Sequence, residues 1–244
     1  VLAGCNNNAS NKETTAENNP VVKSTSSEVK QTTTQEKVKK EKSSVELYNE
    51  MAKNSKSTEE IYVTGDVVVG EGKDVKPGIY DLEITGGSGN IFGTRKNLNK
   101  PFINFLAGAP DSSSHYASKI RIILFDGDVL KFTNISKIKF TAIPEEVQMS
   151  NELGVGEYVV GRDIKPGTYK LSTNKEMNPE FKNLGWDVQI VNELTKKGNN
   201  QRFNSGNTDV VVKLEEGEII STMFQASRYD DLIDDARLIF TEYK

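Results

Sequence analysis

The sequence has 244 residues, of which 35% are hydrophobic and 27% are charged, and its formal net charge at pH 7 is -4. These proportions are ordinary for a soluble protein of one or two domains. The negative charge comes from residues 150–244, which hold 12 basic and 16 acidic residues. No block of basic residues appears, so the composition argues against nucleic acid as a partner.

The chain opens with Leu2-Ala3-Gly4-Cys5, and Cys5 is its only cysteine. A lone cysteine followed by a polar tract has no disulfide partner and no core to enter. The four residues resemble the lipobox of bacterial lipoproteins. The resemblance implies that residues 1–4 are the remnant of a signal peptide and that Cys5 carries a diacylglyceryl group. Two acyl chains would anchor the exported protein to the outer face of the cell membrane. The alternative is a free thiol in an accidental match.

Residues 5–60 are expected to connect this anchor to the folded part of the chain. Between Asn6 and Ser44 there is no aromatic residue, leucine or isoleucine, so this stretch cannot bury enough surface to fold. We expect a disordered linker. At its end, Ser43 and Glu46 form a capping-box pattern that predicts a short helix to about Lys53.

A seven-residue segment, Asp74–Tyr80, recurs as Asp163–Tyr169. Its Lys-Pro-Gly sequence predicts a type II turn, in which glycine takes the positive φ of the third position. The aspartate is expected to accept hydrogen bonds within the turn, and the tyrosine to be buried with its hydroxyl bonded back to the turn. The predicted structural positions are Asp74, Pro77, Gly78 and Tyr80 in the first copy and Asp163, Pro166, Gly167 and Tyr169 in the second.

The repeat continues beyond this segment. Pro77 and Pro166 are 89 residues apart, Gly127 and Gly217 are 90 apart, but Phe140 and Phe240 are 100 apart. The second copy therefore carries an insertion of about ten residues between its last two landmarks. The spacing is that of a duplicated small domain, with modules at 61–149 and 150–244.

Short alternating segments separated by turn residues predict an all-β fold, with two tandem antiparallel β-sandwich or barrel modules. Gly86–Gly89 is expected to be a hairpin connection. The expected strands are 61–69, 79–85, 90–94, 102–106, 120–125, 129–133 and 137–143, then 157–160, 168–172, 186–191, 210–214, 218–224 and 237–242.

Paired Asp-Ile-Lys-Pro-Gly-Thr-Tyr modules behind a lipobox resemble a group of uncharacterised lipoproteins of Gram-positive bacteria. The resemblance covers roughly Val67 to the C-terminus. It implies a fold and a location, and it implies no mechanism.

The insertion is the place where function is expected to differ between the copies. Apolar residues at helical spacing predict a short acidic helix over about 226–236. Its polar faces hold Asp230, Asp231, Asp234 and Asp235. These are either a solvated surface or a contact for a cationic partner or weakly bound calcium.

Few residues could carry catalysis. His115 is the only histidine, and its neighbours Ser112, Ser113 and Ser114 make this loop the one place for a Ser/His arrangement. Neighbours within one loop rarely adopt triad geometry. One histidine and one cysteine cannot form a zinc site of the usual ligands, and no cofactor is predicted.

Trp186 is either a core residue or a platform on which a sugar ring could stack, because it shares a strand face with Val188 and Ile190. The sequence as a whole favours a non-enzymatic binding protein, with an envelope protein or a wall glycan as the partner. The alternatives are a cell-envelope hydrolase that uses the Ser112–His115 loop and a wall-carbohydrate-binding protein.

Overall fold

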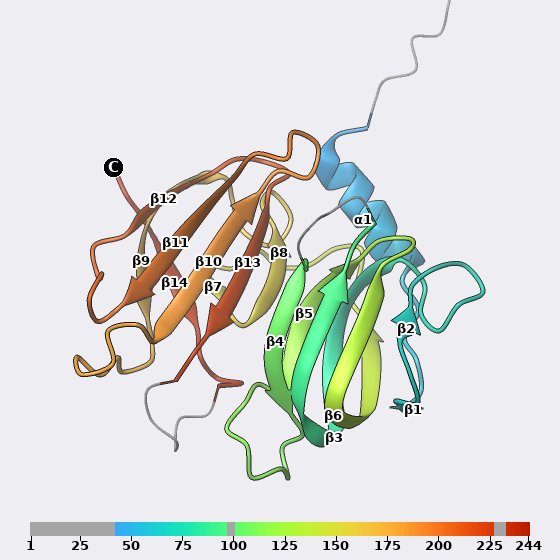
Figure 1. Cartoon of the computed structure of the whole chain (residues 1–244). Helices are drawn as coiled ribbons and strands as arrows, with labels where there is room; N and C mark the ends of the chain where they lie inside the picture. The colour runs from blue at the N-terminus through green and yellow to red at the C-terminus, as the bar shows by residue number, and fades with distance from the viewer. Residues whose placement is uncertain (1–41, 97–100, 227–232) are drawn as a thin grey trace, which may run out of the picture. The chain divides into compact units, whose positions relative to one another are not determined.

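A computed structural model describes residues 42–96, 101–226 and 233–244. These residues form one helix and fourteen strands, so the predicted all-β class is confirmed (Figure 1). No helix among them is long and apolar enough to cross a membrane. The elements are α1 (Ser44–Asn54), β1 (Ile61–Tyr62), β2 (Val67–Val68), β3 (Gly78–Thr94), β4 (Ile103–Gly108), β5 (Lys119–Leu124), β6 (Val129–Ala142), β7 (Glu152–Leu153), β8 (Gly156–Val159), β9 (Gly167–Thr173), β10 (Gly185–Val191), β11 (Gly198–Asn204), β12 (Val211–Leu214), β13 (Ile219–Phe224) and β14 (Leu238–Glu242).

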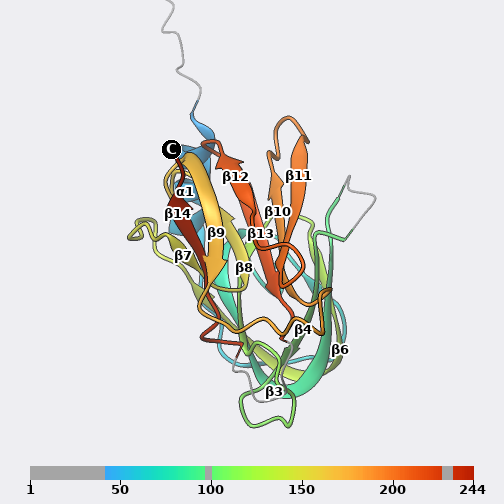
Figure 2. The ribbon, with the colours of Figure 1, turned by 90° about the vertical axis from the view of Figure 1, so that its left-hand side faces the viewer.

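The same pattern of strand pairing occurs in both halves of the chain. In the first half β5, β3, β6 and β1 lie side by side, and in the second half β12, β9, β14 and β7 do so. The other layer also has the same strand order in both halves. It consists of β4, β3, β6 and β2 in the first half and of β11, β10, β13 and β8 in the second. The two halves are thus structurally similar β-modules, seen from two sides in Figures 1 and 2.

The modules differ in how their layers are connected. In the first module β3 and β6 are long strands, of 17 and 14 residues, that pass from one layer into the other. In the second module the equivalent strands are each interrupted. Residues 174–184 separate β9 from β10, and residues 225–237 separate β13 from β14. The second interruption is the insertion that the repeat spacing predicts.

Gly86–Gly89 is not a hairpin connection, contrary to the prediction. These residues lie inside β3, where its pairing with β6 shifts register three times. Gly87 has a φ of 79°, and a side chain on Gly89 would meet the Thr133 carbonyl oxygen. The glycines therefore lie in an irregular part of a continuous strand. The prediction was wrong because β-bulges and turns both favour glycine, which has no Cβ.

The Lys-Pro-Gly segments also differ from the prediction, since neither Gly78 nor Gly167 has a positive φ and each begins a strand. The type II assignment is wrong. A Cβ on Gly78 would lie 2.9 Å from the Tyr80 ring, and one on Gly167 would lie 3.2 Å from the Tyr169 ring. A side chain would therefore crowd the tyrosine ring at both positions, and at Gly78 it would also clash with the Ser55 hydroxyl.

The folded-back tyrosines are buried, and their hydroxyls bond back to the segment before them. Tyr80 donates to the Lys76 carbonyl at 2.8 Å, and Tyr169 donates to the Lys165 carbonyl at 2.9 Å. The aspartates of the repeat accept backbone hydrogen bonds from residues before the segment and not, as predicted, from within the turn: Asp74 from Val68 and Asp163 from Val159. The two copies therefore share one set of polar contacts, as well as an edge-to-face contact between this tyrosine and a phenylalanine of β6 or β14.

The predicted helix is confirmed as α1, with Ser43 and Glu46 forming the expected capping box. Tyr48 and Ala52 are its buried residues. They pack in a cluster with Ile123 of β5 and Val159 of β8, so the helix covers the place where the modules meet.

Several strand predictions differ from the structure: β7 was not predicted, and the strands expected at 129–133 and 137–143 are the single strand β6. The expected strand at 61–69 is broken into β1 and β2. The strand β11 was missed because its residues are almost all polar, and its first residues are exposed. An exposed edge strand shows no apolar alternation from which it could be recognised.

Other predictions fall partly or wholly outside the described residues. Cys5 and the expected linker up to residue 41 lie outside them, as do residues 227–232 of the insertion. The described end of the insertion, 233–236, is a bend and a turn and not the end of a helix.

Replacing Tyr169 by phenylalanine is expected to lower the free energy of unfolding by about 0.5–1.5 kcal/mol, because the Lys165 carbonyl loses its hydrogen bond while the ring still packs. Urea denaturation would measure the change. Tyr62→Phe is the matched control, since Tyr62 is 70% exposed. Equal stability of the Tyr169→Phe variant and the parent would show that this bond contributes nothing.

Candidate functional site

The modules meet where β5 of the first runs parallel to β8 of the second, with Arg121 opposite Gly156. One hydrophobic core continues through both modules. Two cavities open along this junction, one lined mainly by charged and polar groups and one mainly by apolar groups.

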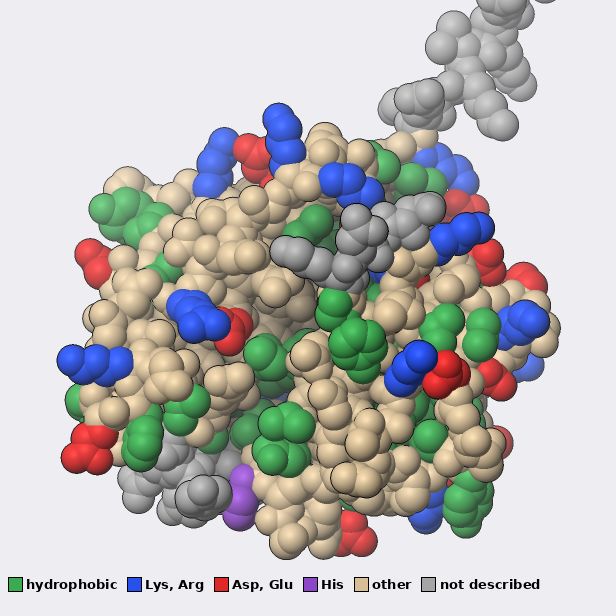
Figure 3. Space-filling model, in the orientation of Figure 1, with side chains coloured by type: hydrophobic (Ala, Val, Ile, Leu, Met, Phe, Trp, Pro, Cys, Tyr) green, Lys and Arg blue, Asp and Glu red, His purple; other side chains and the backbone are tan. Residues whose placement is uncertain are grey.

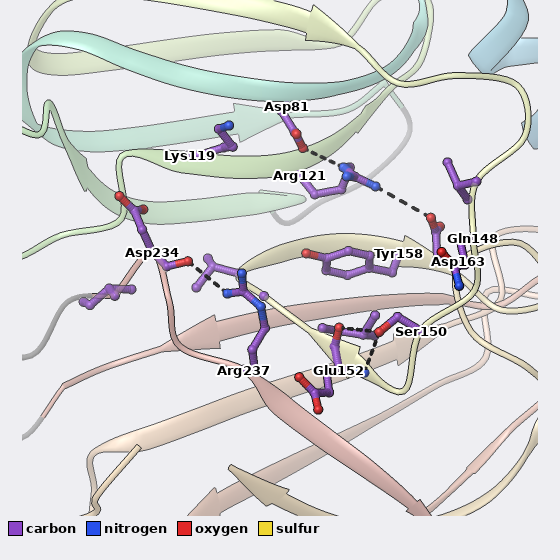
Figure 4. Close-up of a pocket in the computed structure, with 15 residues that line it drawn as sticks. Asp81, Lys119, Arg121, Gln148, Ser150, Glu152, Tyr158, Asp163, Asp234 and Arg237 are labelled. Carbon is purple, nitrogen blue, oxygen red and sulfur yellow. Dashed lines mark hydrogen bonds and ion pairs between the residues drawn. The ribbon is translucent and has the colours of Figure 1, made fainter. Parts of the chain in front are cut away.

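The polar cavity has a volume of about 320 Å³. Arg121 forms its upper wall in Figure 4 and lies between two carboxylates, 2.7 Å from Asp81 and 3.6 Å from Asp163. The Arg121 guanidinium also lies 5.5 Å from the centre of the Tyr158 ring. Arg121 is therefore fully engaged by carboxylates of the protein itself.

The opposite wall of the polar cavity is formed by Arg237, whose Nη1 donates to the carbonyl oxygens of Asp234 and Ala236 at 2.9 and 2.8 Å. No carboxylate among the described residues pairs with Arg237. The Tyr158 hydroxyl points into the same space (Figure 4). Burial raises the pKa of Tyr158 to about 12, so this hydroxyl keeps its proton at neutral pH.

The insertion reaches this cavity through Asp234. Its carboxylate accepts hydrogen bonds from the backbone N–H of Ser118 at 2.8 Å and from the Ser118 hydroxyl at 2.5 Å. Asp235 pairs with Lys175 at 2.5 Å. The two predicted aspartates that the structure describes thus bind groups of this chain, while Asp230 and Asp231 lie outside the described residues.

The apolar cavity is larger, about 660 Å³. Three of its side chains are large hydrophobic groups with considerable exposure: Leu106 at 53%, Tyr116 at 40% and Phe181 at 45%. Figure 3 shows hydrophobic side chains beside His115 on this face. The lining also includes Asn90, Asn104, Phe105, Ala117, Val155, Leu184, Met223, Phe224, Gln225, Ala226 and Ile233.

A second hollow of about 710 Å³ shares Asn104, Phe105 and Met223 with the apolar cavity. It extends between the β4 segment and the outward faces of β10 and β11, where Asp187 and Arg202 form an ion pair at 2.7 Å. We call the two hollows together the junction groove. It follows the chain from Pro101 into β4 as far as Leu106 and is therefore elongated.

The loop of Ser112 and His115 lies at one end of the junction groove. The Ser112 hydroxyl donates to the Ala109 carbonyl at 2.6 Å and lies 2.6 Å from the Ser114 hydroxyl. His115 lines the groove wall. These contacts give the Ser112 hydroxyl a structural role in its own loop.

Trp186 is 1% exposed, packs on Phe224 and donates its indole N–H to Thr173 at 2.9 Å. The assignment of Trp186 as a ligand-binding residue is therefore wrong. Its apolar alternation with Val188 and Ile190 was the correct signal for a core position.

His115, Asp163 and Asp234 line the cavities and were singled out from the sequence, whereas Leu106, Tyr158 and Arg237 were not. Leu106 could have been noticed, because it occupies an outward position of a strand whose inward positions are Phe105 and Ala107. Tyr158 and Arg237 gave no such signal. They come together only because β8 and the residues after the insertion fold against the same junction.

Behind the cavities, buried charges join the modules. Arg95 lies between the rings of Phe102 and Phe125, 4.1 and 4.4 Å from their centres. It pairs with Asp128 of the first module at 3.1 Å and with Glu193 of the second at 3.4 Å.

Glu157 of β8 lies close to this cluster and accepts a hydrogen bond from the Ile123 N–H of β5 at 2.7 Å. Burial raises its pKa to about 7, although the positive charge of Arg95 acts in the opposite direction. The neutral form of this carboxyl is therefore favoured in the folded state.

Glu157→Gln is expected to alter the pH dependence of stability. A carboxyl whose pKa is raised on folding binds more protons in the folded state, so its contribution favours folding below about pH 4.5 and is lost as pH rises to about 7. Glutamine is never ionised and should stabilise the protein at pH 8 by about 1–3 kcal/mol. Thermal unfolding of parent and variant at pH 5 and pH 8 would measure it. A difference that does not grow with pH would contradict the expectation.

No three His, Cys, Asp or Glu side chains within 42–96, 101–226 and 233–244 cluster as ligands for a metal ion. Comparison of the chain with protein-family models, with curated proteins and with solved structures finds no match.

Proposed function

We propose that this protein is an exported lipoprotein that is anchored to the outer face of the cell membrane through Cys5 and binds a partner without catalysis. The partner is an envelope protein that buries apolar side chains in the junction groove. The carrying observation is the gathering of exposed Leu106, Tyr116 and Phe181 around one concave surface. Such patches on soluble proteins mark interaction sites.

The shape of the junction groove supports a binding role. Its walls come from both modules, so its width is set by the rigid junction and not by one loop. Hydrophobic lining with a few polar groups, here Asn90, Asn104 and Gln225, is typical of sites that bind by burial and orient by hydrogen bonds.

Two rival functions have less support. A wall-glycan partner was argued from Trp186, which lies in the core and offers no face for stacking. A hydrolase would need a free nucleophile in the Ser112–His115 loop, and the Ser112 hydroxyl is engaged with Ala109 and Ser114.

Mass spectrometry of the mature protein tests the anchor. We expect an N-terminal Cys5 that carries a diacylglyceryl thioether, and a Cys5→Ser variant that is released from the membrane fraction. Recovery of an unmodified Cys5 with residues 1–4 still attached would overturn this part of the proposal.

Site-specific photo-crosslinking in intact cells tests the groove. A photoreactive amino acid in place of Leu106 is expected to capture one discrete partner. The same amino acid in place of Leu194, which is 75% exposed and does not line the groove, should not capture it.

Substitution of both Tyr116 and Phe181 by aspartate should reduce this crosslink at least tenfold, because charge in an apolar contact is costly to desolvate. Identical capture from Leu106 and Leu194, or crosslinking unchanged by the double substitution, would refute the groove as the binding surface. Capture of wall glycan and no protein would favour the carbohydrate alternative.

A further inference from the structure

We infer that the polar cavity between the modules is a binding site for the carboxylate group of a small ligand, held by Arg237 and Tyr158. This site is separate from the junction groove and does not depend on the function proposed for that groove. Ile233 and Val155 lie between the two, since each lines both cavities.

Arg237 and Tyr158 have hydrogen-bond donors that no described contact uses. Arg237 uses Nη1 for two carbonyl oxygens, and no described contact occupies Nη2 or Nε. The Tyr158 hydroxyl has no described hydrogen-bond partner. A guanidinium binds carboxylate strongly through charge-assisted hydrogen bonds, and a protonated tyrosine adds a third donor.

Arg237 and Tyr158 border one open space beside Gly154. A Cβ built on Gly154 would lie 3.4 Å from Arg237 Nη1 and 3.4 Å from the Tyr158 hydroxyl oxygen. The absence of a side chain at Gly154 therefore leaves room between the two groups. Its φ lies outside the left-handed region, so the glycine is not required by the backbone.

The charged side chains that line the polar cavity limit the charge of the ligand. Three cationic side chains line the cavity, namely Lys119, Arg121 and Arg237, against four acidic ones, namely Asp81, Glu152, Asp163 and Asp234. A doubly charged phosphate would be repelled by these acids, whereas a singly charged carboxylate at Arg237 is repelled less.

The volume sets the size of the ligand. At about 320 Å³ the cavity lies at the small end of ligand-binding pockets. It suits a free amino acid or a similar small acid, or the carboxylate at the end of a peptide. These two sources present the same group to Arg237 and Tyr158.

NMR titration of the full chain with acetate tests the site. We expect saturable shifts of the Gly154 and Val155 amides and of the Arg237 side-chain N–H in the millimolar range, because one carboxylate makes few contacts. Inorganic phosphate at equal ionic strength should bind more weakly. A short peptide with a free C-terminus, compared with its amidated form, distinguishes a peptide end from a small acid as the natural source.

Two variants locate the effect. Arg237→Gln should weaken acetate binding roughly ten- to hundredfold, since it removes the charge-assisted bonds. Gly154→Ala leaves every Arg237 bond in place, makes only ordinary van der Waals contacts and should abolish saturation by filling the space. Arg202→Gln is the control, because it removes the same charge from β11, where Arg202 is 67% exposed.

The proposal fails if acetate causes no saturable shift, or if the shift survives both Arg237→Gln and Gly154→Ala. It also fails if phosphate binds more tightly than acetate, which would assign a different anion. An equal loss of acetate binding in Arg202→Gln and Arg237→Gln would show that the loss comes from the overall charge of the protein and not from this site.

Discussion

The buried contact of Arg95 constrains the whole junction. Its guanidinium is stacked between Phe102 and Phe125 and pairs with Asp128 and Glu193, so one cation serves carboxylates from both modules. Removing one partner of such a cluster leaves an uncompensated buried charge. These buried charges therefore link the two modules at their junction.

The cavities arise from the difference between two otherwise equivalent modules. In the first module β3 and β6 run unbroken between layers, whereas in the second the chain leaves the strands at 174–184 and at 225–237. Described residues of these connections line the cavities: Phe181 and Leu184 from the first, and Ile233 and Asp234 from the second. The shared strands maintain the fold, and the residues that break the symmetry form the candidate sites.

A feature of this fold could be predicted from the sequence where the residues that produce it lie close together in the chain. The capping box of α1 and the hydroxyl contacts of Tyr80 and Tyr169 were predictable because each involves residues within a few positions of one another. The Gly86–Gly89 bulge was misread because its composition is also that of a turn. Pairing of β5 with β8 has no local signal, so nothing in the sequence indicated that Tyr158 and Arg237 face one space.

Duplication explains why such a site exists at all. Residues of both modules line each of the two cavities, and one hydrophobic core runs through both modules. When β8 of the second module aligns with β5 of the first, the ends of both modules form walls around spaces that neither would enclose alone. Substitutions in the inserted connections can then change what these spaces bind while the repeated strands, with their tyrosine and aspartate contacts, stay unchanged.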